Sequence, residues 1–162
     1  MATVYLSLGS NLGEREANIR NALNRLSQYQ NIRIQDVSSL YETASVGYTD
    51  QPDFINIAVR IETAISPMEL FYACVEIESE MGRVRNFHLE PRVIDIDILL
   101  CDNVVMHTPE LTIPHPRMME RAFVMAPLAE IAPDLILPGG KTPGEILIIL
   151  KDQRIRKLAE VK

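Results

Sequence analysis

Two aspartates, Asp95 and Asp97, lie two residues apart in an apolar segment rich in isoleucine and leucine. In a β-strand such residues share a face, so both carboxylates point together while the neighbouring isoleucines point into the core. At a Cα separation of about 6–7 Å, and an effective dielectric constant near 20, two anions repel by roughly 2–3 kcal/mol. A divalent cation reverses the sign of that cost, and two carboxylates can bracket one Mg²⁺ or bridge two. We predict a metal site here; the alternatives are a solvated strand face or pairing with Arg92.

Cationic side chains are concentrated in the segment that surrounds these aspartates. No lysine precedes Lys141, whereas five arginines and all three histidines lie between residues 83 and 121. Arginine suits bidentate binding of carboxylate or phosphate. The segment therefore indicates either an anionic small ligand or a set of surface ion pairs. The formal net charge of −6 argues against a general nucleic-acid binder, which would normally be basic.

The length and composition indicate one compact domain covering residues 1–162, with 47% apolar and 23% charged residues. No apolar run reaches the ~18–20 residues needed to span a bilayer, and the N-terminus does not have the pattern of a signal peptide. The two cysteines, Cys74 and Cys101, lack metal-site spacing and suit buried free thiols in a reducing compartment. We expect a cytoplasmic monomer without membrane or nucleic-acid partners.

The hydrophobic periodicity and the turn residues predict alternating strands and helices that would position the aspartates. Capping boxes predict helix starts at Ser66 and Thr142. The predicted elements are a strand at 3–8, a glycine turn at 9–13, a helix at 14–28, strands at 32–41 and 54–63, a helix at 67–81, a strand at 93–100, a hairpin at 102–105, and helices near 117–131 and 143–151.

The first hundred residues thus read β-α-β-β-α-β, the order of a ferredoxin-like antiparallel sheet backed by two helices. The C-terminal hairpin and helices would cover the remaining sheet surface. The predicted fold class is therefore α+β, arranged as an α/β/α sandwich. This arrangement hosts many functions, so the fold alone does not identify the chemistry.

Several other chemistries lack their sequence signatures. The stretch Gly139–Thr142 resembles the end of a Walker A loop, but Leu135 stands where the first glycine is required. The histidines do not have the spacing of a zinc-binding helix. No G-x-S-x-G motif or protein-kinase signature occurs.

Six ordered segments together resemble the 6-hydroxymethyl-7,8-dihydropterin pyrophosphokinase family. They are Tyr5-Leu6-Ser7-Leu8-Gly9-Ser10-Asn11-Leu12-Gly13, Gln51-Pro52-Asp53-Phe54-Ile55-Asn56, Gly82-Arg83-Val84-Arg85, Pro91-Arg92-x-x-Asp95-x-Asp97-Ile98-Leu99-Leu100, Ile113-Pro114-His115-Pro116-Arg117 and Arg121-Ala122-Phe123. The resemblance implies transfer of the β,γ-diphosphate of ATP to the pterin hydroxymethyl group, with release of AMP, in the folate pathway.

The resemblance also implies a role for each matching position. Two Mg²⁺ ions fall on Asp95 and Asp97, which with Arg83 and Arg92 form the catalytic set. The nucleotide-binding positions are Glu78, Arg83, Arg85, Arg92, Ile98, His115 and Arg121. The pterin-binding positions are Thr43, Val46, Phe54, Asn56, Asp95 and Phe123. The segments around 44–52 and 83–92 are loops that close over the substrates in this family.

Two differences from the family pattern fall beside the Pro-Arg pair, where Leu89 replaces a common tryptophan and Glu90 replaces a small residue. The competing functions are a non-enzymatic ferredoxin-like module, either a small-ligand sensor or an RNA-binding domain, and a Mg²⁺-dependent kinase that makes ADP. An RNA-binding sheet would need a basic surface with exposed aromatics. The nucleotide product, AMP or ADP, separates the two enzyme alternatives.

Overall fold

The computed structural model describes residues 1–43, 53–82 and 93–161. Within these residues, antiparallel strands form a six-stranded sheet in the order β5-β1-β4-β3-β8, with β2 also paired to β4. The strands of this sheet are β1 (Ala2–Ser10), β2 (Ile32–Val37), β3 (Ser39–Thr43), β4 (Phe54–Thr63), β5 (Asp95–Cys101) and β8 (Ile155–Glu160). The predictions for Val46, Arg83, Arg85, Leu89, Glu90 and Arg92 lie outside the described residues.

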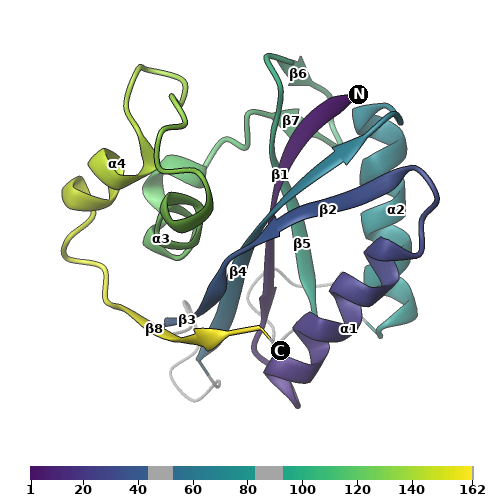
Figure 1. The fold of residues 1–162 in the computed structure, drawn as a ribbon, viewed down its shortest axis with the longest axis horizontal. Helices are drawn as coiled ribbons and strands as arrows, with labels where there is room; N and C mark the ends of the chain where they lie inside the picture. The colour runs from purple at the N-terminus through teal and green to yellow at the C-terminus, as the bar shows by residue number, and fades with distance from the viewer. Residues whose placement is uncertain (44–52, 83–92, 162) are drawn as a thin grey trace.

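Helices cover both faces of the sheet (Figure 1). Helices α1 (Arg15–Ser27) and α2 (Pro67–Glu80) lie on one face, and α3 (Ala122–Ile131) lies on the other with α4 (Pro143–Ile149) beside it. The 3₁₀ helix η1 (Met118–Glu120) precedes α3. The antiparallel α+β class is confirmed. Among the described residues, no helix is long and apolar enough to cross a membrane.

Two hydrophobic cores lie on opposite faces of the sheet. The larger contains alternate residues of β4, such as Ile55 and Ile57, together with apolar residues of α1 and α2. The second contains Ala58, Leu99 and Leu100 packed against apolar residues of α3. Because successive strand residues face opposite ways, β4 contributes to both cores.

A β-bulge changes the register between β1 and β5. Leu6 pairs with Ile98, but the preceding residue, Tyr5, pairs with Leu100, so Leu99 is an extra residue on β5. Leu99 and Leu100 therefore both belong to the core on the α3 side.

The helix starts with capping boxes were well predicted, and several strand limits were not. Both capping boxes are present, at Ser66 with Glu69 and at Thr142 with Glu145. Residues 9–10 were predicted to be in a turn but continue β1, with Ser10 paired to Ile55. The prediction was wrong here because pairing with β4 outweighs the local turn preference of a Gly-Ser sequence.

The predicted strand at 32–41 is divided at Ser38. Its backbone N–H donates to the Ala58 carbonyl at 2.9 Å, and its hydroxyl accepts from the Ala58 N–H at 2.9 Å. A side-chain oxygen therefore occupies a position that a ladder carbonyl would otherwise fill. The predicted helix near 117–131 is likewise divided, at Arg121, whose extended backbone separates η1 from α3.

The C-terminal part differs most from the prediction. The turn at Asp102 is present, with a positive φ of 46°, but the following residues do not pair back onto β5. A separate pair of short strands follows, β6 (Met106–His107) and β7 (Thr112–Ile113). Strand β8 was not predicted, because most of its residues are exposed and its polar and apolar residues do not alternate.

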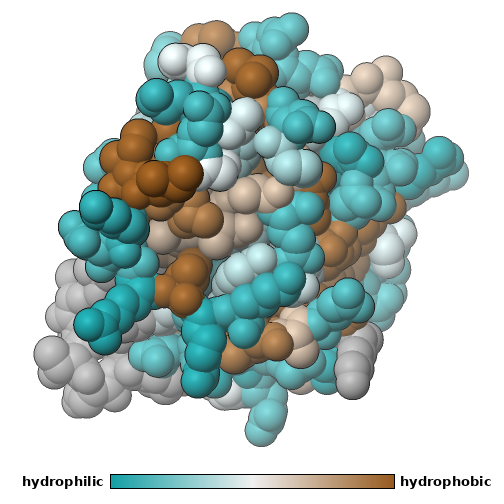
Figure 2. All heavy atoms as spheres, turned by 60° about the vertical axis from the view of Figure 1, so that its left-hand side comes forward, coloured by the Kyte–Doolittle hydropathy of each residue, from teal (hydrophilic) through white to brown (hydrophobic). Residues whose placement is uncertain are grey.

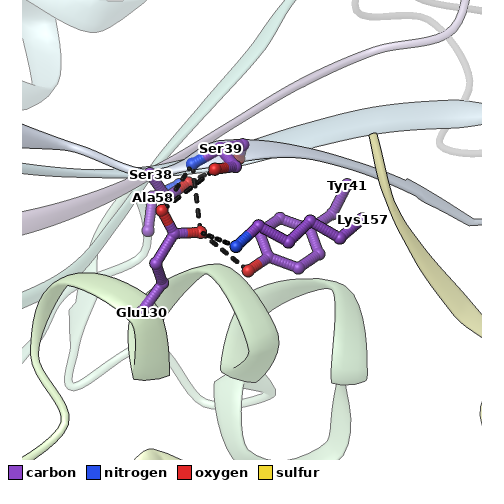
Figure 3. Close-up of polar contacts among 6 residues, drawn as sticks. All are labelled: Ser38, Ser39, Tyr41, Ala58, Glu130 and Lys157. Carbon is purple, nitrogen blue, oxygen red and sulfur yellow. Dashed lines mark hydrogen bonds and ion pairs between the residues drawn. The ribbon is translucent and has the colours of Figure 1, made fainter. Parts of the chain in front are cut away.

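Glu130 near the end of α3 ties the helix to the sheet (Figure 3). Its carboxylate accepts hydrogen bonds from the Ser39 N–H at 3.1 Å, the Ser39 hydroxyl at 3.0 Å and the Tyr41 hydroxyl at 2.7 Å. Lys157 of β8 approaches the same carboxylate at 3.9 Å. These contacts join α3, β3 and β8 at one point.

The side of the molecule formed by α3 and α4 carries apolar patches between polar side chains (Figure 2). Ile148 and Ile149 of α4 are among the exposed large apolar residues of the described chain.

Candidate active site

Asp95 and Asp97 lie on the sheet face covered by α3, as the two-residue spacing predicted. Leu99, two residues further along β5, packs in the core on the α3 side, whereas Ile96 and Ile98 pack in the opposite core. Both aspartates are partly buried. The two carboxylates therefore share one face at the sheet's edge strand.

Glu78 of α2 holds the backbone between the two aspartates. The residue is 1% exposed, and its Oε2 accepts the Ile96 N–H at 2.8 Å. Among the described residues β5 pairs only with β1, and at its other edge the Glu78 side chain accepts a backbone hydrogen bond. Ile98 was predicted at the nucleotide site, but its side chain packs in the core on the α1 and α2 side, and the residue is 4% exposed. Only its main chain lies near the face that carries the aspartates.

Gly9 lies between the aspartates and the predicted pterin residues. It pairs with Asp95 of β5 on one side and with Asn56 of β4 on the other. Directly paired residues point to the same face, so Asp95 and Asn56 flank Gly9 with Cα atoms about 10 Å apart. A Cβ on Gly9 would collide with Oδ1 of Asn56, and it would lie 3.7 Å from the Phe54 ring. The absence of a side chain at Gly9 lets the Asn56 amide lie over β1.

The Asn56 amide has a donor that no described residue accepts. The residue is 4% exposed, and its Nδ2 is a buried side-chain atom without a hydrogen-bond partner among the described residues. A buried donor left in this way costs about 1–3 kcal/mol, so a ligand acceptor at this position would recover that free energy.

The backbone near the bulge places His115 beside β5. The His115 N–H donates to the carbonyl of Leu99 at 2.9 Å, and the imidazole Nδ1 accepts the Arg117 N–H at 3.1 Å. A nitrogen that accepts cannot carry the proton, so neutral His115 holds its proton on Nε2. Burial, with the charges of Arg121 and Arg117, lowers the pKa of His115 from 6.5 to about 4. The imidazole is therefore neutral at neutral pH.

Arg121 lies within electrostatic range of both aspartates. Burial lowers the pKa of its guanidinium, and Asp97 and Asp95 act in the opposite direction. The guanidinium also lies over the Phe123 ring, 5.4 Å from its centroid. The structure thus brings together Asp95, Asp97, His115 and Arg121, with Phe123 under the arginine.

Thr43 lies at the end of β3, directly paired with Phe54. Its hydroxyl donates to the Arg154 carbonyl at 3.2 Å, which connects this strand end to the chain just before β8.

The sequence did not identify two residues that support the site, Gln153 and Gly9. Gln153 accepts the Ala122 N–H at 2.8 Å and donates to the Glu120 carbonyl at 2.7 Å, so it caps α3 next to Arg121. Gly9 was assigned to a turn, although a glycine inside an apolar strand pattern often marks a close approach of another group. No comparable local signal identifies Gln153, which follows Arg121 by more than 30 residues.

Comparison with known proteins identifies the family. Residues 5–133 match the profile of the family described as 7,8-dihydro-6-hydroxymethylpterin-pyrophosphokinase (HPPK). The chain belongs to this family. The resemblance of six sequence segments had indicated the same family. The matched range contains the candidate site residues.

Relatives and solved structures agree with this assignment. A 2-amino-4-hydroxy-6-hydroxymethyldihydropteridine pyrophosphokinase of Bacillus subtilis (strain 168) is 49% identical over 127 residues, 78% of this chain and 76% of the relative. One of the same name from Methylorubrum extorquens is 42% identical over 158 residues, 98% and 99% of the two chains. The fold is similar to that of an HPPK-DHPS crystallised with substrates, with a TM-score of 0.71 and 15% identity, covering 91% of this chain and 43% of that one. The chain is a pyrophosphokinase.

Proposed function

We propose that this chain transfers the β,γ-diphosphate of ATP to the hydroxymethyl group of 6-hydroxymethyl-7,8-dihydropterin and releases AMP, as a step in folate synthesis. The observation that carries the proposal is the row Asp95–Gly9–Asn56 across three adjacent strands. This row places the acidic pair beside the buried Asn56 amide, whose Nδ2 has no hydrogen-bond partner among the described residues. A charged diphosphate donor and a flat, hydrogen-bonding acceptor need these two environments side by side.

Asp95 and Asp97 fit two Mg²⁺ ions. Carboxylate oxygens are ligands that Mg²⁺ prefers, and both aspartates point to one face of an edge strand. When bound, the metal would neutralise phosphate charge and orient ATP. Glu78 would keep the two aspartates in place through the Ile96 N–H rather than contact the metal itself.

Arg121 and His115 would bind the phosphates beside the acidic pair. The guanidinium supplies positive charge and several donors, which suits phosphate oxygens. His115, neutral with its proton on Nε2, would donate one hydrogen bond without adding charge. Arg83, Arg85 and Arg92 complete this phosphate site by their match to the family pattern. Transfer of this kind depends mainly on positioning and charge neutralisation, which these residues would provide.

The pterin would lie over Gly9. Asn56 Nδ2 would donate to an acceptor on the ring edge, while Phe54 and Phe123 would pack against the ring faces. Thr43, paired with Phe54, borders this part of the site, and Val46 joins it by its match to the family pattern.

The decisive experiment is to identify the nucleotide product. Protein, ATP, Mg²⁺ and the hydroxymethyl dihydropterin are incubated, and the products are separated by chromatography. The proposal expects AMP and the pterin diphosphate in equal amounts. ADP would instead indicate an ordinary kinase, and no turnover would indicate a binding module.

An isosteric substitution tests the acidic pair. We expect Asp97→Asn to reduce turnover by at least 1,000-fold with the fold intact, because an amide cannot replace a carboxylate charge at a metal site. Asp36→Asn is the matched control, since Asp36 of β2 forms a partly exposed ion pair with Arg60 away from the site. Near-normal turnover of Asp97→Asn would contradict the metal assignment.

A further inference from the structure

Arg15, the first residue of α1, reaches two strands at once. Its Nη1 lies 2.9 Å from Oε2 of Glu42 and 2.6 Å from the carbonyl oxygen of Asp53. Glu42 belongs to β3, and Asp53 immediately precedes β4. A single guanidinium group therefore joins the end of one strand to the beginning of its neighbour.

These two strands end at the pterin side of the site. The described pairing of β3 with β4 finishes at Thr43 with Phe54, next to the pairs Glu42 with Ile55 and Tyr41 with Asn56. Terminal pairs of a ladder open more readily than internal pairs, because fewer contacts hold them. Arg15 thus acts where the Thr43–Phe54 pair would otherwise be least constrained.

The contacts of Glu42 are unequal. Its side chain is 14% exposed and lies between Arg15, which is 28% exposed, and Arg156 of β8, which is 73% exposed. Burial alone would raise the pKa of Glu42, but the two guanidinium groups outweigh it and lower the pKa. An exposed pair such as Glu42–Arg156 contributes little, whereas the less exposed Arg15 pair is screened less by water.

A simple surface ion pair would explain the contact with Glu42 alone. It would not explain the second hydrogen bond, to a backbone carbonyl on the other strand. Arg20 of the same helix provides the comparison: within the described part of the chain its ion pair is with Glu16 one turn away, and both side chains are more than two-fifths exposed. Arg15 differs because its two acceptors lie 11 residues apart on separate elements.

We propose that Arg15 is a positioning residue for the pterin, holding the ends of β3 and β4 so that Thr43, Phe54 and Asn56 keep the spacing that pterin binding requires. This inference rests on the proposed function. Arg15 does not contact the substrate; it acts through the two strand ends that it joins.

The test measures the binding of each substrate separately, so that no reaction occurs. The hydroxymethyl dihydropterin is titrated by calorimetry without ATP into wild-type protein and into Arg15→Gln, Arg15→Lys, Arg156→Gln and Arg20→Gln. ATP with Mg²⁺ is titrated without the pterin. Thermal unfolding shows that each variant is folded.

We expect Arg15→Gln to bind the pterin at least tenfold more weakly and ATP within twofold of wild type. The pterin affinity of Arg15→Lys should lie between those of wild type and Arg15→Gln, because an ammonium keeps the charge but not the planar guanidinium geometry. Arg156→Gln should stay within threefold and Arg20→Gln within twofold of wild type. In ligand-free protein, amide hydrogen exchange near residues 42–43 and 53–55 should be at least tenfold faster in Arg15→Gln.

Pterin affinity in Arg15→Gln equal to that of wild type would overturn the role of Arg15, and so would an equal loss for ATP and pterin or an equal loss in Arg20→Gln. The proposed function is tested separately by the nucleotide product, and it fails if the wild-type chain releases no AMP. A wild-type chain that releases AMP, combined with unchanged pterin affinity in Arg15→Gln, would overturn this inference alone.

Discussion

At the residue scale, the space above Gly9 determines where the Asn56 amide can lie. We predict that Gly9→Ala raises the KM for the pterin at least tenfold, because a Cβ would displace Oδ1 of Asn56 and approach the Phe54 ring. The KM for ATP should change less than threefold. Steady-state kinetics with each substrate varied in turn measures both values.

Gly144→Ala is the matched control for this substitution. A Cβ at Gly144 meets nothing within 4 Å, and this residue lies in α4. Its kinetics should match wild type, and alanine should favour the helix slightly. Unchanged pterin KM in Gly9→Ala would show that the Asn56 amide does not need its place over β1.

His115 links the site to pH through a lowered pKa of about 4. The unfolded chain, with an ordinary histidine pKa near 6.5, binds the proton first as the pH falls. The stability that His115 contributes is therefore fully present above about pH 6.5 and is lost as the pH falls toward 4. We predict that the free energy of unfolding of wild type, relative to His115→Gln, is constant at higher pH and declines across this window.

Urea unfolding between pH 4 and 7.5 measures this difference, and an NMR titration of the imidazole gives its midpoint directly. A midpoint near 6.5 would contradict the burial of a neutral His115. Because the neutral form also leaves Nε2 as a donor, the same result would remove the argument for its place at the phosphates.

At the scale of elements, α2 supports β5 through the hydrogen bond from Ile96 to Glu78. We predict that Glu78→Ala lowers stability by about 1–3 kcal/mol because a buried N–H loses its acceptor. For a chain of this length that corresponds to roughly 2–10 °C in Tm. Turnover should also fall, by tenfold or more, because the backbone between the aspartates is released.

Glu78→Gln separates positioning from charge, since its amide oxygen can still accept the Ile96 N–H. It should retain most of the stability and at least a third of the turnover. Glu78→Gln could instead keep the stability of wild type and lose as much turnover as Glu78→Ala. That result would mean that the reaction needs the carboxylate charge and not the hydrogen bond.

Elements with a strong local pattern were predictable from the sequence. The capping boxes at Ser66 and Thr142 and the alternating residues of β4 were identified correctly because each signal lies within a few residues. The bulge at Leu99 and the break at Ser38 depend on pairing with distant strands, so no local pattern revealed them. Strand β8 has mostly exposed residues, and its pairing with β3 supplies the order that its own sequence lacks.

At the scale of the whole molecule, the site depends on contacts between residues far apart in the chain. The Asp95–Asp97 pair was predicted from spacing alone, but the position of Asn56 beside it required the register of three strands. The supports of the site, such as Arg15 with Glu42 and Glu130 with Ser39, join residues separated by 27 and 91 positions. Such pairings arise from the folded topology and leave no periodic signal in the sequence.

The carboxylate of Glu130 is one of these long-range connections, and it joins the helix layer to two strands (Figure 3). We predict that Glu130→Ala lowers the free energy of unfolding by about 2–4 kcal/mol. The buried Ser39 donors and the Tyr41 hydroxyl lose their acceptor, and each buried donor left unsatisfied costs about 1–3 kcal/mol. Urea unfolding followed by circular dichroism measures the change.

Lys157→Ala provides the control for Glu130→Ala. Its ammonium lies 3.9 Å from the same carboxylate and its side chain is 58% exposed, so removing it should change stability by less than about 0.5 kcal/mol. Equal losses in the two variants would mean that the ion pair, rather than the hydrogen bonds to β3, holds α3. Because α3 begins directly after Arg121, Glu130→Ala should also weaken ATP binding, whereas Lys157→Ala should not.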